Sequence, residues 1–304
     1  MAPEELAAWI ALQRVEGMGA ASLGRLLARF GSAQATLAAS PDELAQVPKV
    51  PGLVLRGVHA AAGAIEQARG VAARVAAEGI AAIRPGDAAY PTRLHALASP
   101  PALLYVRGRL PHDAKPTFGI VGTTEPSDHG REIARAVARR LATLGWAIVS
   151  GHARGIDAAA HQGALEASCA TILVLPTGIL QFRPHLGYPP AEVLWRRAAA
   201  ISEWHPDAPW QTLAALARNR VTAALSDALL LVESRERGGA LGTLRHALAL
   251  GRRAFVVRFR APALSAAGNS IAQAAGAQPV SSLRELEQLL RRPPQSRRQA
   301  ELRW

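Results

Sequence analysis

The segment 150–161 carries the residues with the clearest chemistry in this sequence, in the order Ser-Gly-His-Ala-Arg-Gly-Ile-Asp-Ala-Ala-Ala-His. It follows the apolar run 146–149 and precedes an alanine-rich stretch, which predicts a strand, a tight turn and a helix. Such a turn leaves backbone N–H groups free and directs a helix N-terminus toward solvent, where an anion binds favourably. The guanidinium of Arg154 adds a forked positive charge that suits phosphate. We therefore expect a phosphate group, on a nucleotide or on a nucleic-acid backbone, to bind here. The residues expected to contact it are Ser150, Gly151, Arg154 and Gly155.

Asp157 and His161 lie four residues apart, on one face of the predicted helix. Asp157 would complement the helix dipole or pair with Arg154. The two residues could also perform acid–base chemistry or hold a metal ion. Because no further ligand accompanies them at metal-binding spacing, we expect no metal site and favour a structural hydrogen-bonding pair over a catalytic one.

Three more turns follow predicted strands: Gly122-Thr123, then Pro176-Thr177-Gly178, and then Glu233 with Gly238-Gly239 at a helix start. Parallel strands end at the same edge of a sheet, so all four turns would offer N–H groups to one cleft. We expect Gly122, Thr123, Gly238 and Gly239 to contact phosphate and Glu233 to support the site. The dinucleotide motif Gly-x-Gly-x-x-Gly does not follow the first strand, and a Walker motif is absent, so no cofactor is expected.

The tripeptide Arg218-Asn219-Arg220 is a candidate phosphate clamp, with a solvated helix face as the alternative. Three tryptophans, Trp195, Trp204 and Trp210, stand close together in the sequence. Tryptophans of this kind stack on bases in some single-strand-binding proteins, although packing in a core or loop is more common.

Apolar runs alternate with helical stretches between residues 81 and 290, which predicts a doubly wound, mostly parallel α/β sheet. The expected strands are 80–83, 103–108, 118–122, 146–149, 171–175, 200–202, 228–232 and 254–257. The expected helices lie near 130–144, 156–167, 190–199, 211–225 and 239–250.

Residues 1–80 predict a separate helical domain, with a helix start at Ser40-Pro41 and a third helix over 53–77. Its Gly17-Met18-Gly19 turn is similar to a helix-hairpin-helix, which binds the DNA backbone. A bundle that only packs on the next domain is favoured, because the turn carries no basic residue. The tail 291–304 is rich in Pro and Arg and is expected to be disordered.

Composition limits the class of protein. The chain has 304 residues and a net charge of +12, which favours a polyanionic partner, although arginine-for-lysine bias in a GC-rich genome explains it equally well. The single cysteine, Cys169, allows no internal disulfide and fits the cytoplasm. No apolar run is long enough to span a membrane, and the acidic N-terminus is not a signal peptide.

Taken together, these motifs resemble the DNA-processing protein A family, also called Smf, from about residue 8 to residue 285. The most specific element is Ser150-Gly151-x-Ala153-Arg154-Gly155-Ile156-Asp157. The other matching segments are Tyr90-Pro91, Pro100-Pro101-Ala102-Leu103-Leu104-Tyr105-Val106-Arg107-Gly108, Gly119-Ile120-Val121-Gly122, Tyr188-Pro189-Pro190, Ser202-Glu203, Arg218-Asn219-Arg220, Leu225-Ser226-Asp227, Val232-Glu233 and Gly239-Ala240-Leu241.

The resemblance implies an extended Rossmann-like domain behind a helical, SAM-like N-terminal domain. It also implies a non-enzymatic protein that binds single-stranded DNA, forms a homodimer and helps to load the recombinase RecA during natural transformation. The chain departs from the family at Thr124-Glu125, where an arginine contacts DNA, and at Ala215-Leu216, in place of Phe-Pro. It also has Val257-Arg258-Phe259 in place of Val-Pro-Gly, and it ends before the winged-helix-like domain of many members.

Three functions are open at this stage, and a recombination mediator that binds single-stranded DNA is favoured. The second is a nucleotide sensor or phosphoribohydrolase of the same superfamily, because 238–243 is similar to the motif Pro-Gly-Gly-x-Gly-Thr. The absence of a matching glutamate after that segment argues against hydrolysis. The third is a structural partner that has lost DNA binding, which Glu125 would permit because it repels phosphate.

Overall fold

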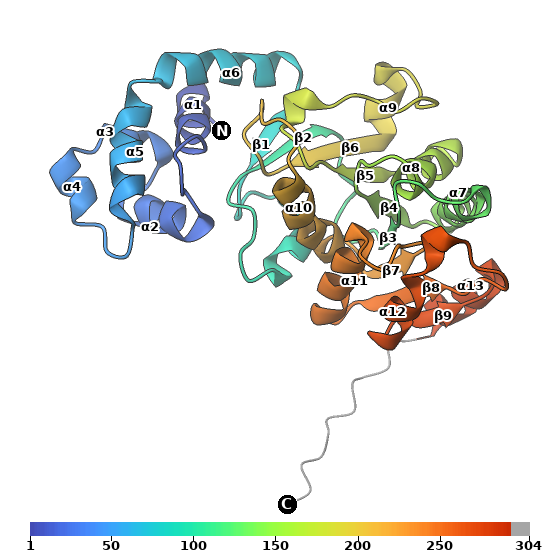
Figure 1. Cartoon of the computed structure of the whole chain (residues 1–304). Coiled ribbons are helices and arrows are strands. Elements are labelled where there is room, and N and C mark those ends of the chain that lie inside the picture. Colours follow the sequence, from blue (N-terminus) through green and yellow to red (C-terminus); the bar gives the residue numbers. More distant parts are fainter. Residues whose placement is uncertain (293–304) are drawn as a thin grey trace, which may run out of the picture.

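A computed structural model describes residues 1–292 of the chain (Figure 1). The N-terminal helices are α1 (Pro3–Leu12), α2 (Ala20–Phe30), α3 (Ala33–Ala38), α4 (Pro41–Ala45), α5 (Gly52–Ala62) and α6 (Ile65–Ala77). The strands are β1 (Ala81–Ile83), β2 (Leu104–Gly108), β3 (Thr117–Val121), β4 (Ala147–Ser150), β5 (Thr171–Val174), β6 (Ala198–Ser202), β7 (Ala228–Leu231), β8 (Arg253–Val257) and β9 (Gln278–Val280). The remaining α-helices are α7 (Asp128–Thr143), α8 (Ile156–Glu166), α9 (Ala191–Arg197), α10 (Thr212–Ala224), α11 (Gly239–Ala249), α12 (Asn269–Ala274) and α13 (Leu283–Arg291). The short 3₁₀ helices are η1 (Thr92–Ala96), η2 (Ile179–Gln181) and η3 (Leu264–Ala266).

The strands in residues 1–292 form one nine-stranded sheet in the order β1-β2-β6-β5-β4-β3-β7-β8-β9. The pairs β1–β2 and β2–β6 are antiparallel, and the other pairs are parallel. Gly119 of β3 pairs with Val149 of β4 on one side and with Leu229 of β7 on the other. The chain therefore reverses its direction of winding between β3 and β7, which is the point where open α/β sheets bind ligands. This topology confirms the predicted doubly wound, mostly parallel α/β fold.

Helices cover both faces of the sheet (Figure 1). Side chains alternate along each strand, so that Leu230 of β7 packs with α7 and α8 while Leu229 and Leu231 pack with α11. In β5, Leu173 faces the N-terminal helices while Ile172 faces α10. The parallel strands are buried on both sides, which explains why they are almost continuously apolar in the sequence.

The N-terminal helices share a hydrophobic core with β2, β5 and β6. A polar link reinforces this contact: the Tyr105 hydroxyl donates to Oε1 of Gln13 at 2.7 Å, and Nε2 of Gln13 donates to the carbonyl of Glu203 at 3.2 Å. The predicted helix start at Ser40-Pro41 is confirmed, and the structure adds a capping box in which Ser40 and Glu43 are bonded to each other's backbone.

The single helix predicted over 53–77 is wrong, because α5 ends at Ala62 and α6 begins at Ile65. Short-range bonds from Gly63 N to Ala60 O and from Ala64 N to Ala61 O close α5 with a tighter last turn. The sequence analysis also did not predict β9, α12 or α13. The predicted basic tail lies, from residue 293 onward, outside the described residues.

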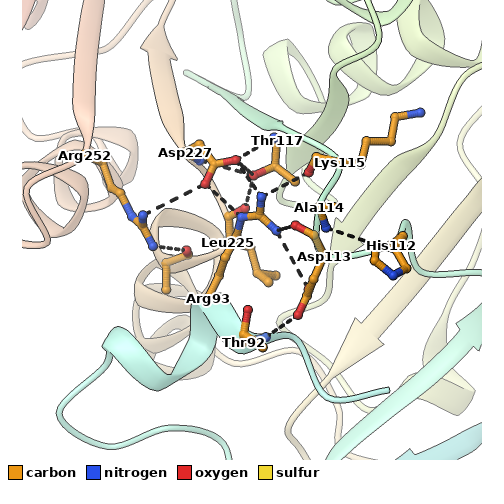
Figure 2. A network of polar contacts seen from close by, with 11 residues as sticks. Thr92, Arg93, His112, Asp113, Ala114, Lys115, Thr117, Leu225, Asp227 and Arg252 are labelled. Carbon is orange, nitrogen blue, oxygen red and sulfur yellow. Dashed lines mark hydrogen bonds and ion pairs between the residues drawn. The ribbon is translucent and has the colours of Figure 1, made fainter. Parts of the chain in front are cut away.

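A network of hydrogen bonds and ion pairs lies at the amino-terminal edge of the sheet (Figure 2). Arg93 donates from Nε and Nη2 to the two carboxylate oxygens of Asp227, both at 2.8 Å. The same carboxylate accepts from the backbone N of Thr117 at 2.9 Å. Burial acts to raise the pKa of Asp227, but the hydrogen bonds from Arg93 and Thr117 overcome it and lower that pKa. The network joins the segment between β1 and β3 to the starts of β3 and β7.

Within residues 1–292, no helix has both the length and the apolar character needed to cross a membrane.

Candidate functional site

A cleft of about 580 Å³ lies at the carboxyl-terminal edge of the sheet, at the point where the winding reverses. Three of the four predicted turns contribute several residues each, those after β3, β4 and β7, and the fourth contributes Pro176. The rest of the lining comes from the end of β3, the first turns of α8 and α11, α10 and the residue before the cap of α10. The lining residues are Val121, Gly122, Thr123, Thr124, Gly151, His152, Ala153, Asp157, Pro176, Trp210, Thr212, Ala215, Leu216, Arg218, Asn219, Thr222, Ser234, Arg235, Arg237, Gly238, Gly239, Ala240 and Thr243.

Most of the predicted ligand residues lie at this cleft, but some do not. Those that line it are Gly122, Thr123, Gly151, Arg218, Asn219, Gly238 and Gly239. Ser150, Arg154, Gly155 and Arg220 are not part of the lining. Ser150 is fully buried, and its hydroxyl donates to the carbonyl of Ile120. Arg154 is exposed.

The turns after β3 and β4 pack directly on each other. Ile156 N donates to the carbonyl of Thr123 at 3.2 Å. Gly155 has φ +78°, and a Cβ at this position would lie 2.5 Å from the same carbonyl oxygen. Only glycine fits both conditions without strain. The expectation that the N-terminus of α8 faces solvent is therefore wrong, since Gly155, Ile156 and Asp157 are all buried.

Two buried residues of opposite charge, Arg218 and Asp157, lie at the floor of the cleft. Arg218 donates from Nη1 to the carbonyl of Val174 at 2.7 Å, and its Nε is buried with no hydrogen-bond partner among the described residues. Burial lowers the pKa of Arg218, an effect that the charge of Asp157 opposes. Burial likewise raises the pKa of Asp157, and Arg218 opposes that shift. The predicted partner of Asp157, Arg154, is thus wrong.

Gly151 separates the two charged groups. A Cβ at Gly151 would overlap the carboxylate of Asp157 and would lie 2.6 Å from Cζ of Arg218. The glycine at this position is required because the guanidinium and the carboxylate approach the backbone so closely.

His161 is hydrogen-bonded to the turn after β4, at Gly151. It is fully buried, and burial lowers its pKa to about 3, so the ring is neutral at physiological pH. Because a carbonyl can only accept, Nε2 donates to Gly151 O at 3.1 Å, and Nδ1 contacts the Thr171 hydroxyl at 2.7 Å. Asp157 accepts from Ala153 N at 3.4 Å at the other end of the turn. Asp157 and His161 thus hold two ends of one turn rather than each other.

The predicted clamp of two arginines around Asn219 is wrong. Arg220 points away from the cleft, where it pairs with the carboxylate of Glu203 and donates to the carbonyl of Ser99 at 3.1 Å. Asn219 donates to the carbonyl of Gly239 at 3.1 Å and so joins α10 to the start of α11. Residues two apart on a helix differ by about 200° in direction, so Arg218 and Arg220 could not both face one ligand.

Glu233 is fully buried behind the cleft and fixes three loops together. Its carboxylate accepts from Ser127 N at 2.9 Å, from the Ser127 hydroxyl and from the Ser265 hydroxyl at 2.8 Å. Its carbonyl accepts from Thr123 N at 2.8 Å. Gly130 leaves room for this carboxylate, since a Cβ there would lie 2.5 Å from Cδ of Glu233.

The turn after β5 is hydrogen-bonded to the loop that follows β6. Gly178 N donates to Ala208 O at 2.9 Å, and Leu180 N donates to Pro206 O at 3.0 Å. A Cβ at Gly178 would overlap the backbone of Pro206. Of the three predicted residues, only Pro176 lines the cleft.

The sequence analysis missed two cations of the cleft, Arg235 and Arg237. Arg235 is exposed and pairs with the carboxylate of Glu125, which is also exposed. Arg237 is exposed, and no carboxylate pairs with it in residues 1–292. Their position between a buried strand and a glycine-rich helix start was the signal available in the sequence.

A family model described as "DNA recombination-mediator protein A" matches residues 81–291, and a "DprA-like N-terminal HHH domain" matches residues 3–51. The chain belongs to the DNA recombination-mediator protein A family. Protein Smf of Synechocystis is 33% identical over 264 residues, which make up 84% of this chain and 65% of that protein. DNA processing protein DprA of Bacillus subtilis is 32% identical over 181 residues, 59% of this chain and 61% of that protein. The chain therefore spans less than two thirds of each of these two relatives.

Two solved structures of family members also match. DNA processing protein A from Streptococcus pneumoniae has a TM-score of 0.72 at 22% identity, covering 93% of this chain and 97% of that one, and so shares the fold. DNA processing protein A from Helicobacter pylori, described with a single-stranded DNA binding mode, has a TM-score of 0.60 at 25% identity, covering 69% and 95%.

Proposed function

We propose that this protein binds single-stranded DNA in the cleft at the β3/β7 switch point and acts without catalysis as a recombination mediator. The observation that carries the proposal is the convergence on one cleft of three glycine-containing turns and the guanidinium groups of Arg218, Arg235 and Arg237. Arg218 is a buried cation in the floor of the cleft, close to the charge of Asp157, and Arg237 is an exposed cation that pairs with no carboxylate in residues 1–292. Backbone N–H groups and guanidinium groups both favour phosphate oxygens.

The start of α11 supports the same ligand. Gly239 begins this 11-residue helix beside the cleft, with Gly238 as its cap. A ligand can approach the backbone of Gly239 closely, because the atom nearest to a Cβ at this position would be Cδ2 of Leu216 at 4.0 Å. A phosphate at this position would meet free N–H groups and the positive end of the helix dipole.

Family membership extends the proposal. The relative from Helicobacter pylori is described as binding single-stranded DNA, and we propose the same ligand for this chain. We further propose that the protein acts in the cytoplasm as a homodimer and delivers single-stranded DNA to a RecA-type recombinase during DNA uptake. These partners rest on the family resemblance, and the cleft accounts for the DNA ligand alone.

The test measures binding of a fluorescent oligo-dT by anisotropy between about 50 and 200 mM salt. The substitution Arg237→Ala should weaken binding roughly three- to tenfold. It should also reduce the slope of log K against log salt concentration by about 0.7, the value for one phosphate contact on a single strand. Arg139→Ala is the matched control, because Arg139 is exposed near the far end of α7, away from the cleft. It removes the same charge and should leave the affinity close to that of the parent.

Equal losses in Arg237→Ala and Arg139→Ala would show that net charge rather than the cleft drives binding. Binding of free nucleotides without any binding of oligo-dT would support the nucleotide sensor instead. Single-stranded DNA should also bind more tightly than a duplex of the same length, and the reverse order would contradict the proposal.

A further inference from the structure

Trp210 lines the cleft, and 61% of its surface is exposed. The two other tryptophans of the same region are placed differently. Trp195 packs against Phe182 and under the guanidinium of Arg107, whose Cζ lies 4.9 Å from the ring centroid. Trp204 is only partly exposed, and it does not line the cleft. The exposed indole of Trp210 therefore offers a large, flat apolar surface to a ligand in the cleft.

The cleft lining is divided between polar and apolar residues. The turns after β3, β4 and β7 contribute glycines and arginines, whereas the N-terminal part of α10 and the residue before its cap contribute Trp210 and Leu216. Leu216 is 49% exposed, and Leu213, one turn earlier on α10, is 78% exposed. A single-stranded nucleic acid has the same division, with charged phosphates along one side and flat apolar base faces along the other.

The segment that carries Trp210 is held in place before any ligand arrives. The loop that precedes Trp210 is bonded to the turn after β5 through Gly178 and Leu180, and Pro206 within it is buried. Pro209 restricts the backbone directly before Trp210, and α10 begins two residues later at Thr212. The indole can then bind with little loss of conformational entropy, since only its two side-chain torsions need to be fixed.

We infer that Trp210 is a stacking platform for a nucleobase of the single strand, with the phosphates of that strand on the glycine turns. This inference rests on the proposed function and assigns the base-contacting residue within it. The stacking is independent of base identity, because every base presents a π face. Leu216, which lines the same cleft, adds exposed apolar surface to it.

The experiment compares an oligo-dT with an abasic deoxyribose-phosphate oligomer of equal length and charge, measured with parent protein, Trp210→Ala and Trp210→Phe. The parent should bind oligo-dT at least about fivefold more tightly than the abasic oligomer. Trp210→Ala should abolish that preference while keeping the affinity for the abasic oligomer and the salt dependence. Trp210→Phe should retain most of the preference. Leu264→Ala, at an apolar residue 94% exposed after β8, is the control for loss of surface apolar area and should change neither affinity.

The outcomes separate the inference from the function on which it rests. If the parent binds both oligomers equally and with a steep salt dependence, the cleft binds phosphate but the platform is wrong. If Trp210→Ala weakens both oligomers equally, or instead changes the oligomeric state with no change in the preference for bases, Trp210 is not a stacking residue. If the parent binds neither oligomer, both the proposed DNA binding and the stacking role of Trp210 are wrong.

Discussion

The substitution Gly151→Ala tests the geometry of the cleft floor most directly. The new Cβ would lie 2.6 Å from Cζ of Arg218, well inside the 3.4 Å at which ordinary contact begins, and it would also overlap the carboxylate of Asp157. Both groups are buried, so neither can move aside into water. The guanidinium must leave the Val174 carbonyl that it now contacts at 2.7 Å.

The expected cost follows from these contacts. Loss of a hydrogen bond from a charged donor destabilises by about 1.5–3 kcal/mol. Separating a buried charge from its partner costs about 3–5 kcal/mol when the other charge remains uncompensated. The two effects share the same guanidinium and do not add fully, so we expect Gly151→Ala to lower the free energy of unfolding by about 2–5 kcal/mol.

Urea denaturation followed by far-ultraviolet circular dichroism measures this loss. Gly239→Ala is the control, because its Cβ would find Cδ2 of Leu216 no closer than 4.0 Å and no other heavy atom within that distance. An alanine in place of a helical glycine is neutral or stabilising by up to about 1 kcal/mol. The same pair of variants also separates folding from binding, since Gly239→Ala should impair oligo-dT binding without loss of stability.

A double-mutant cycle completes the test. In an Arg218→Met background the alanine at 151 meets an uncharged and flexible side chain, and its cost should fall by about 1–3 kcal/mol. The reasoning is refuted if Gly151→Ala is as stable as Gly239→Ala, or if its cost is the same with and without the arginine.

Two further predictions concern charged pairs away from the floor. The pKa of Asp227 is lowered in the folded protein, so its ion pair with Arg93 stabilises at neutral pH, and this stability is lost as pH falls through the ordinary value near 4 toward the lower folded value. Asp227→Asn should remove about 1–3 kcal/mol at pH 7 and flatten the acid limb of stability against pH, and an unchanged acid limb would contradict this. Glu125→Gln should free Arg235 for phosphate, raise the affinity for oligo-dT about two- to fivefold and steepen its salt dependence by about 0.7, with no change in thermal stability. An unchanged affinity in that variant would show that the Arg235 guanidinium contacts no DNA.

Much of the candidate site was predictable, because it depends on backbone topology. A parallel sheet brings the ends of β3, β4, β5 and β7 to one edge whatever the side chains are, so turns that follow apolar runs had to meet. Gly151 and Gly239 could therefore be assigned to one cleft from the sequence. The last elements, β9, α12 and α13, are short and were not predicted from the sequence.

The direction in which each side chain points could not be predicted from the sequence. Arg154 is nearest in sequence to Asp157, yet the residue that compensates the carboxylate is Arg218, which arrives from α10 on the opposite face of the sheet. Likewise, Trp195 and Trp210 share a residue type and a region, but one packs on Phe182 and the other lines the cleft. From β1 to β8, the sequence alone determined the order of strands and helices along the chain and the edge where their turns converge, because local periodicity and chain connectivity specify both. Only the tertiary structure decided which arginines and which tryptophan face the cleft, because burial and pairing depend on segments that are distant in the chain.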